Sequence, residues 1–195
     1  MADDVKNGLW KGPDRRTRCA WCRGSDDYVT YHDTEWGFPV RDDRRLFEKI
    51  TLEGFQSGLS WLTILRKREN FRSAFADFDP EAVARFGARD VKRLLGDAGI
   101  VRHRGKIEAA IANARGTLAL REAGTPLQQL VWTHRPKPSR PVKSIYDLPS
   151  TTPESVALSK KLKRAGFRFV GPTTAYATMQ ACGLVNDHLA DCAFR

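Results

Sequence analysis

Residues 42–58 read DDRRLFEKITLEGFQSG, and this stretch has the clearest periodicity in the chain. Its apolar residues Leu46, Phe47, Ile50 and Phe55 recur at helical spacing, with charged residues between them. That pattern predicts an amphipathic helix whose apolar stripe faces a core. The stretch decides the fold class, because the rest of the chain carries further helical patterns of similar or shorter length.

Start and stop residues mark the other predicted helices. Asp79 can cap a helix that has Pro80 in its first turn, and Gly99 is expected to end a later one. No alternation of apolar and polar residues is long enough to support a sheet, so the predicted fold is all-α. The predicted helical ranges are 60–67, 79–86, 88–97, 106–122, 127–132, 152–166 and 172–182.

The chain has 195 residues, which suits one domain or two small lobes that share a core. Residues 1–18 are polar and are expected to form a flexible N-terminal arm before a single domain at residues 19–195. The formal net charge of +10 favours a polyanionic partner such as nucleic acid, although such charge can also serve solubility alone. No apolar stretch approaches the roughly 20 residues of a membrane span, and residues 1–18 lack a signal-peptide core, so a cytoplasmic protein is expected.

Two pairs of potential metal ligands stand near opposite ends of the chain. Cys19 and His32 form one pair, and His188 and Cys192 form the other at a spacing that a helix places on one face. A set of two cysteines and two histidines suits tetrahedral zinc, and four protein ligands would make the site structural. The alternative is buried free cysteines and core histidines, and Cys22 is a competing ligand.

Glu53 stands among apolar and aromatic neighbours within residues 42–58. It is either a surface residue on the polar side of the helix or a buried acid whose pKa is raised. Aromatic residues accumulate in the same part of the sequence. They would either pack in the core or line a pocket that stacks a flat base. These residues are Trp21, Tyr28, Tyr31, Trp36 and Trp61.

The segment DAGIVRHRGKI, residues 97–107, joins two predicted helices through a short glycine-containing turn. Turns of this type can aim main-chain N–H groups at a phosphate. Arg102, His103, Arg104 and Lys106 would add cationic contacts to a nucleic-acid backbone. A charged helix start can also be merely solvated, but the net positive charge of the chain favours DNA binding.

Six runs of sequence, in order, resemble the DNA-3-methyladenine glycosylase I family of bacterial helix-hairpin-helix enzymes. They are YHDTEWG (31–37), LFEKITLEGFQSGLSW (46–61), LRKRENFRSAF (65–75), DAGIVRHRGKI (97–107), ALSKKLKRAGFRFVG (157–171) and MQACGLVNDH (179–188). The resemblance covers the chain from Arg18 to Cys192. It implies an all-α helix-hairpin-helix bundle in which one structural zinc joins the N- and C-terminal segments.

The resemblance also implies roles for individual residues. Glu53 falls on the family's pocket acid, and Gln56 should share its helical face. Leu59 falls on the residue that fills the gap left by a flipped nucleotide. The implied pocket aromatics are Tyr28, Tyr31 and Trp61 with their neighbours Trp21 and Trp36. The implied DNA-contacting residues are Leu59, Gly99, Val101, Arg102, Arg104 and Lys106, and the implied zinc ligands are Cys19, His32, His188 and Cys192.

Three positions depart from the family's pattern. Phe55 stands where some relatives have a polar residue, and Cys22 is an added thiol. Ala177 stands where some relatives have a serine in the pocket, which puts one hydroxyl contact in doubt.

The reaction implied by the resemblance is hydrolysis of the N-glycosidic bond of 3-methyladenine in alkylated duplex DNA. No lysine of the hairpin is placed to form a Schiff base, so AP-lyase activity is not expected. The expected protein is a bacterial, cytoplasmic monomer that joins the nucleoid when it is bound to DNA. Two other classes stay open: a non-catalytic zinc-bearing DNA-binding protein, and a metallohydrolase, which needs an open position on its zinc.

Overall fold

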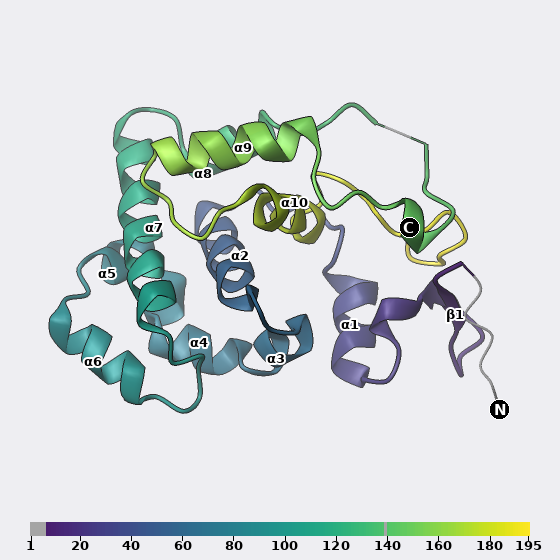
Figure 1. Cartoon of the computed structure of the whole chain (residues 1–195), viewed down its shortest axis with the longest axis horizontal. Coiled ribbons are helices and arrows are strands. Elements are labelled where there is room, and N and C mark those ends of the chain that lie inside the picture. Colours follow the sequence, from purple (N-terminus) through teal and green to yellow (C-terminus); the bar gives the residue numbers. More distant parts are fainter. Residues whose placement is uncertain (1–6, 139) are drawn as a thin grey trace.

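The computed structural model describes residues 7–138 and 140–195, and its body is helical as predicted (Figure 1). The first helices are α1 (Asp26–Thr34), α2 (Asp43–Gln56), α3 (Trp61–Arg66), α4 (Arg68–Ala74), α5 (Pro80–Ala84) and α6 (Ala88–Gly96). They are followed by α7 (Arg104–Glu122), α8 (Leu127–Trp132), α9 (Pro153–Arg164) and α10 (Pro172–Ala181). Short 3-10 turns connect some of them: η1 (Ala20–Cys22), η2 (Ala76–Phe78) and η3 (Ile145–Asp147).

Helix α2 lies at the centre of the molecule, and every residue from Leu46 to Phe55 is buried. Asp42 caps its start, because the side chain accepts a main-chain hydrogen bond of 2.9 Å from the first turn. Helices α7, α8 and α10 pack against it, and α3 follows its end. The charged residues that stand between its apolar ones, Glu48, Lys49 and Glu53, are therefore buried as well.

Start signals in the sequence locate three helices correctly. Ser60, Asp79 and Thr152 each accept a main-chain hydrogen bond from the first turn of the helix that follows. The helix predicted over residues 88–97 ends one residue early, at Gly96, because the backbone of Asp97 is extended, so Gly99 is not the residue that stops it. The Asp97 side chain accepts a hydrogen bond of 2.7 Å from Gly99 N, so this glycine belongs to the turn before α7.

Residues 9–19 form a β-hairpin, which corrects two expectations: a flexible arm over residues 1–18 and a chain without strands. Strands β1 (Leu9–Lys11) and β2 (Thr17–Cys19) pair antiparallel. Strands of three residues are too short to give a readable alternation. The buried Arg18 fixes the hairpin through ion pairs of 2.7 Å with Asp14 and 2.8 Å with Asp33 of α1. Residues 1–6 of the expected arm lie outside the described residues.

The hairpin and the C-terminal segment meet beside α1. Ala193 N donates a hydrogen bond of 2.8 Å to Thr17 O in β2. Cys19, Leu189 and Cys192 form a small buried cluster that is separate from the main core. In Figure 1 the yellow C-terminal segment accordingly lies close to the hairpin. The fold thus brings the two predicted pairs of metal ligands to the same region.

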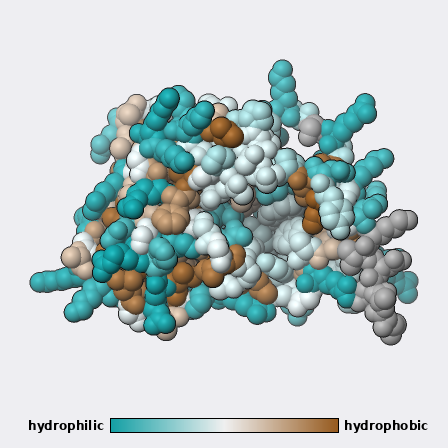
Figure 2. Space-filling model, in the orientation of Figure 1, coloured by the Kyte–Doolittle hydropathy of each residue, from teal (hydrophilic) through white to brown (hydrophobic). Residues whose placement is uncertain are grey.

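The main core is built around α2, α7 and α10 and includes a row of phenylalanines from α4 to η2. The face drawn in Figure 2 is hollowed near its middle, where α2, α3 and α10 approach α1. Within residues 7–138 and 140–195, no helix has both the length and the apolar character needed to cross a membrane.

Candidate active site

A cavity of about 240 Å³ opens among α1, α2, α3 and α10. All six residues that we expected in a base pocket lie on its wall, and Glu53 lies there with them. Leu148 and Gln180 also line it, although neither was predicted from the sequence. The full lining is Trp21, Tyr28, Tyr31, Trp36, Glu53, Gln56, Trp61, Leu148, Ala177 and Gln180.

Aromatic rings form one side of the cavity and hold one another in place. The Trp21 ring meets Trp36 edge-on with centroids 5.1 Å apart, and it meets Tyr28 in the same way at 5.6 Å. Tyr31 is tilted against Trp61 at 5.4 Å. The Tyr28 hydroxyl accepts a hydrogen bond of 2.9 Å from the main chain of α3, which ties α1 to that helix. The rings therefore form a fixed wall on which a flat ligand can stack.

Glu53 lines this cavity with only 5% of its surface exposed. Of the two possibilities that the sequence left open, the structure therefore places it as a buried acid. Burial raises the pKa of Glu53 to about 7, and the nearby charge of Lys49 opposes that rise. Within the described residues, no hydrogen bond contributes to its pKa. A buried carboxylate without a partner is costly, so the site is suited to a ligand that supplies a donor or a positive charge.

A wider groove of about 570 Å³ continues from the cavity along the turn between α2 and α3. Glu53, Gln56 and Ala177 line both spaces. Leu59 stands on the groove with 41% of its surface exposed. The preceding Gly58 has a φ of +81°, which glycine adopts without steric cost. The turn therefore presents an exposed apolar side chain beside the entrance of the cavity.

Residues 97–103 form the predicted turn between α6 and α7. Lys67 Nζ donates to two carbonyl oxygens of this turn, including that of Gly99 at 3.2 Å, and so holds it against the junction of α3 and α4. His103 caps α7, because its Nδ1 accepts a main-chain hydrogen bond of 3.2 Å from the first turn. The turn is therefore rigidly placed on both sides.

The surface of this turn carries groups that can bind a phosphate. Arg102 and Arg104 are exposed there. The main-chain N–H groups of Val101 and Arg102 have no hydrogen-bond acceptor within the described part of the chain. Free N–H groups next to the start of a long helix form a favourable anion site.

Lys106 does not lie where a DNA contact requires it. Its buried ammonium group donates hydrogen bonds to the carbonyl oxygens of Phe55, at 2.9 Å, and of Ser57. These carbonyls belong to the C-terminal end of α2, where a cation is favourable. The expectation that Lys106 contacts DNA is therefore corrected: it connects α7 to α2.

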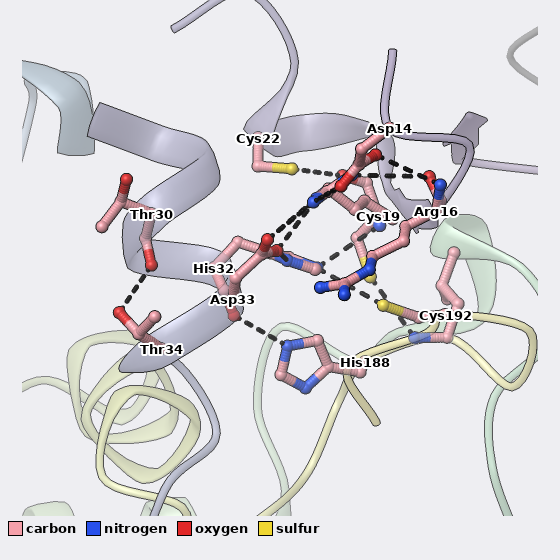
Figure 3. A network of polar contacts seen from close by, with 12 residues as sticks. Asp14, Arg16, Cys19, Cys22, Thr30, His32, Asp33, Thr34, His188 and Cys192 are labelled. Carbon is pink, nitrogen blue, oxygen red and sulfur yellow. Dashed lines mark hydrogen bonds and ion pairs between the residues drawn. The ribbon is translucent and has the colours of Figure 1, made fainter. Parts of the chain in front are cut away.

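A cluster of metal-ligating side chains lies where the hairpin meets the C-terminal segment (Figure 3). The donor atoms of Cys19, His32 and Cys192 all lie within 4.8 Å of one another, and all three residues are buried. Two thiols and one imidazole are ligands that zinc prefers. Contacts from the Cys19 thiol and the His32 ring lower the pKa of Cys192, which favours the thiolate that binds metals. The residues present thus fit a zinc ion.

Asp33 orients the imidazole of this cluster. Its Oδ1 lies 2.7 Å from Nδ1 of His32, and Arg18 holds the same carboxylate from the other side. The Nε2 atom of His32 then faces the other two residues of the cluster: it accepts a hydrogen bond of 3.4 Å from Cys19 N and lies 3.5 Å from Cys192 Sγ. A carboxylate behind a histidine is a common support of metal-binding imidazoles.

His188, the fourth predicted ligand, stands beside the cluster without belonging to it. Its ring meets the His32 ring edge-on, with centroids 4.7 Å apart. Its Nε2 lies 3.2 Å from the carbonyl oxygen of His32, and its Nδ1 lies 2.9 Å from Oδ1 of Asn186. The competing Cys22 thiol donates to the carbonyl oxygen of Cys19 at 3.1 Å, so it points elsewhere.

The cluster and the cavity share their aromatic side chains. Trp21 lies edge-on to His32 at 5.3 Å, and Trp36 lies edge-on to His188 at 4.7 Å. Both tryptophans also line the cavity. The position of the cavity wall therefore depends on the packing around the cluster.

Two of the departures from the family's pattern, Phe55 and Ala177, differ in their effect on the cavity. Phe55 packs in the core 4.7 Å from Phe71 and does not line the cavity, so its change leaves the site intact. Ala177 does line the cavity, so the missing hydroxyl is a real difference there. Gln180 lies one turn after Ala177 in α10, so the two side chains share a face of the helix. This spacing is a sequence signal that predicts Gln180 as a lining residue. Leu148 had no such signal, because it lies in a loop far away in sequence.

Sequence similarity over most of the chain identifies its family. Residues 21–195 match the family described as methyladenine glycosylase. The chain belongs to this family. DNA-3-methyladenine glycosylase 1 of Escherichia coli (strain K12) is 51% identical over 178 residues, which are 90% of this chain and 95% of the relative. DNA-3-methyladenine glycosylase of Haemophilus influenzae is 46% identical over 179 residues, 90% of this chain and 96% of the relative.

Solved structures agree with this methyladenine glycosylase assignment. A crystal structure of 3-methyladenine DNA glycosylase I has a TM-score of 0.88 at 50% identity, and the match covers 90% of this chain and 98% of that chain. The glycosylase I of Staphylococcus aureus, in a study of 3-methyladenine recognition, has a TM-score of 0.86 at 39% identity over 90% of this chain and 95% of that one. The protein is therefore an enzyme, a DNA glycosylase of this family.

Proposed function

We propose that this methyladenine glycosylase hydrolyses the N-glycosidic bond of 3-methyladenine in alkylated duplex DNA and leaves the strand intact. One observation carries the proposal: the buried carboxylate of Glu53 lines a cavity walled by aromatic rings and has no hydrogen-bond partner among the described residues. The positive charge of a flat, cationic base would complement the carboxylate, and the faces of the base would stack on the aromatic rings. The names of the Escherichia coli and Staphylococcus aureus relatives support this choice of base.

The charge of the damaged base makes it a good leaving group. A base methylated at N3 is cationic while it is attached to the sugar. When the bond between C1′ and N9 breaks, its electron pair stays on the base and neutralises that charge, so the base leaves without being protonated. Water forms the new bond to C1′, and its proton passes to the solvent directly or through Glu53. We assign to Glu53 the recognition of the cationic base and the stabilisation of the positive charge that develops on the sugar.

Entry to the cavity requires the damaged nucleotide to leave the base stack, which costs a few kcal/mol. The exposed side chain of Leu59 lies on the adjoining groove and would fill the gap in the duplex. The free N–H groups of Val101 and Arg102, with the exposed Arg104, would bind the phosphate backbone as a helix-hairpin-helix motif. The formal charge of +10 supports this electrostatic contact.

The absence of a usable amine supports an enzyme without lyase activity. No lysine lines the cavity in the described part of the chain. Lys106 is held by two carbonyl oxygens, and Lys49 lies over the ring of Tyr31. Formation of a Schiff base with C1′ needs a lysine that reaches the sugar. Because one chain supplies every wall of the cavity, we also propose that the monomer is active.

We assign one structural zinc ion to the clustered Cys19, His32 and Cys192. We assign His188 as the fourth ligand because its ring packs edge-on against His32; to bind the ion, its Nε2 would have to leave the carbonyl oxygen of His32. When bound, the ion would fasten the segment before α1 to the segment after α10. All three clustered donors are buried, which supports a structural site and disfavours a metallohydrolase, whose zinc must meet its substrate.

Chromatography of the bases released from methylated duplex DNA tests the proposal. We expect 3-methyladenine from the wild type and a loss of about 100-fold or more in Glu53→Gln, the usual scale for removal of one electrostatic stabiliser. Ala177→Ser is the matched control on the same cavity wall and should stay active. The product strand should break only after alkali. A wild type that releases no 3-methyladenine contradicts the function, and a fully active Glu53→Gln contradicts the role of Glu53 alone.

A further inference from the structure

Lys49 is buried directly behind the wall of the cavity. It lies in α2 one helical turn before Glu53, so the two side chains share a face of the helix. Only 6% of its surface is exposed, and its ammonium nitrogen lies 5.2 Å from the centre of the Tyr31 ring. Tyr31 itself lines the cavity. A lysine at this depth is kept only with compensating negative charge.

Glu35 supplies only part of that compensation. Lys49 Nζ lies 3.6 Å from Oε2 of Glu35. Arg68 already holds the same carboxylate through two hydrogen bonds of 2.7 and 2.9 Å. One carboxylate therefore faces two cations. Glu35 is only half-buried, whereas Glu53 is fully buried, and among the described residues Lys49 is the cation that acts on Glu53.

We propose that Lys49 is a positioning residue that favours the ionised form of Glu53 in the empty cavity and so sets the pH range in which the enzyme accepts a cationic base. This inference rests on the proposed function. Burial favours the neutral acid, and an ammonium group one turn away favours the carboxylate. The two effects act in these directions on the pKa of Glu53, which stands at about 7 with Lys49 present. A neutral Glu53 has no charge to offer the base or the developing sugar cation.

The other titratable groups around Glu53 do not replace Lys49. Tyr31 from α1 and Cys182 at the end of α10 both interact with Glu53, but burial raises the pKa of each, so both are neutral near pH 7. Lys106 of α7 approaches α2 only at its last turn, where two carbonyl oxygens hold it. Helix α3 contributes Trp61 to the cavity wall, and the side chain of Trp61 does not titrate.

The pH profile of Lys49→Met tests this inference, with Lys49→Arg as the matched control that keeps the charge. Initial rates of 3-methyladenine release from methylated duplex DNA are measured between pH 5.5 and 9. The charge on the attached base is fixed, so the acid limb of kcat/KM reports an ionisation of the enzyme. We expect Lys49→Met to move the midpoint of that limb upward by about 0.5–2 pH units, the scale of one nearby opposite charge. Activity then falls about 3- to 100-fold at pH 6.5 and returns to within about twofold of the wild-type level at pH 9, whereas Lys49→Arg keeps the wild-type midpoint.

Thermal unfolding of each variant identifies any loss of fold, and Lys49→Gln removes the same charge if Lys49→Met does not fold. An acid limb that stays in place overturns the inference. A loss of the same size at every pH also overturns it, because damaged packing does not depend on the ionisation of Glu53. If the wild type releases no base at all, the proposed function has failed instead, so the two failures are distinguishable.

Discussion

The ammonium group of Lys106 donates a hydrogen bond to the main-chain carbonyl oxygen of Phe55, 2.9 Å away. This contact joins the first turn of α7 to the last turn of α2, two residues beyond Glu53. A second hydrogen bond, to Ser57, continues into the turn that carries Leu59. The turn proposed to bind phosphate and the acid of the cavity are therefore connected through one side chain.

Replacement of Lys106 by methionine should affect stability and leave the phosphate contacts intact. The variant loses two charge-assisted hydrogen bonds at the end of α2, and we expect a destabilisation of about 2–4 kcal/mol in chemical unfolding. The dependence of DNA affinity on salt should keep its wild-type slope. Arg102→Ala is the comparison, because loss of one phosphate contact lowers that slope by about 1 without loss of stability. A reduced slope in Lys106→Met would show that this lysine contacts DNA after all.

Replacement of Glu53 by glutamine should stabilise the protein at high pH while it removes activity. Burial raises the pKa of this acid from 4.5 to about 7, so the folded state holds its proton more tightly than the unfolded state does. Its ionisation therefore costs no stability below about pH 4.5, and the cost grows as the pH rises through 7. We expect Glu53→Gln to exceed the wild type by up to about 3 kcal/mol at pH 8 and to match it near pH 4.5, in urea unfolding at both values. An equal difference at the two pH values would contradict a raised pKa.

Metal analysis of the purified protein should find one zinc ion per chain. Removal of the ion by a chelator should lower the unfolding temperature by about 10 °C or more, because a structural zinc contributes several kcal/mol to folding. Cys192→Ser should lose the ion. Cys22→Ser is its control and should keep the ion, since the Cys22 thiol points to the carbonyl oxygen of Cys19. Equal zinc content in the two variants would remove Cys192 from the ligand set.

Replacement of Leu59 by alanine should separate the opening of the duplex from the chemistry. The side chain is largely exposed on the groove, so its loss should change the free energy of unfolding by less than about 0.5 kcal/mol. Release of 3-methyladenine from duplex DNA should fall about 10-fold, since the empty gap is no longer filled, whereas release from single-stranded DNA should change little. An equal loss on both substrates would place Leu59 in the chemical step.

Most helices could be predicted from local sequence because their starts carry a local signal. Ser60, Asp79 and Thr152 satisfy free N–H groups of the helix that follows, and this chemistry needs no other part of the chain. The hairpin was missed because its register depends on Arg18, whose ion pair with Asp33 reaches across to α1. A contact of that kind leaves no periodic pattern in either segment.

The candidate site was predictable where the resemblance covers it, and less so from the residues themselves. The burial of Glu53 depends on α7 and α10, which cover α2 from both sides, so its neighbours in sequence could not settle it. Lys106 was misplaced for a related reason: a lysine in a basic run resembles its exposed neighbours until the carbonyl oxygens of Phe55 and Ser57 are seen beside it. The loop that carries Leu148 to the cavity is held by a residue that is distant in sequence, because Ile145 N donates a hydrogen bond to Asn7 O.

The cluster of Cys19, His32 and Cys192 also imposes an order of events on a newly made chain. Cys192 and His32 are 160 positions apart, yet they meet at the cluster on which Trp21 and Trp36 rest. Synthesis at about 5–20 residues per second separates these two residues by roughly 8–32 s. During that interval His32 cannot meet Cys192, so the Cys–His cluster beside Trp21 and Trp36 is incomplete. The packing that supports this wall of the cavity is therefore completed last, after the helical core has been made.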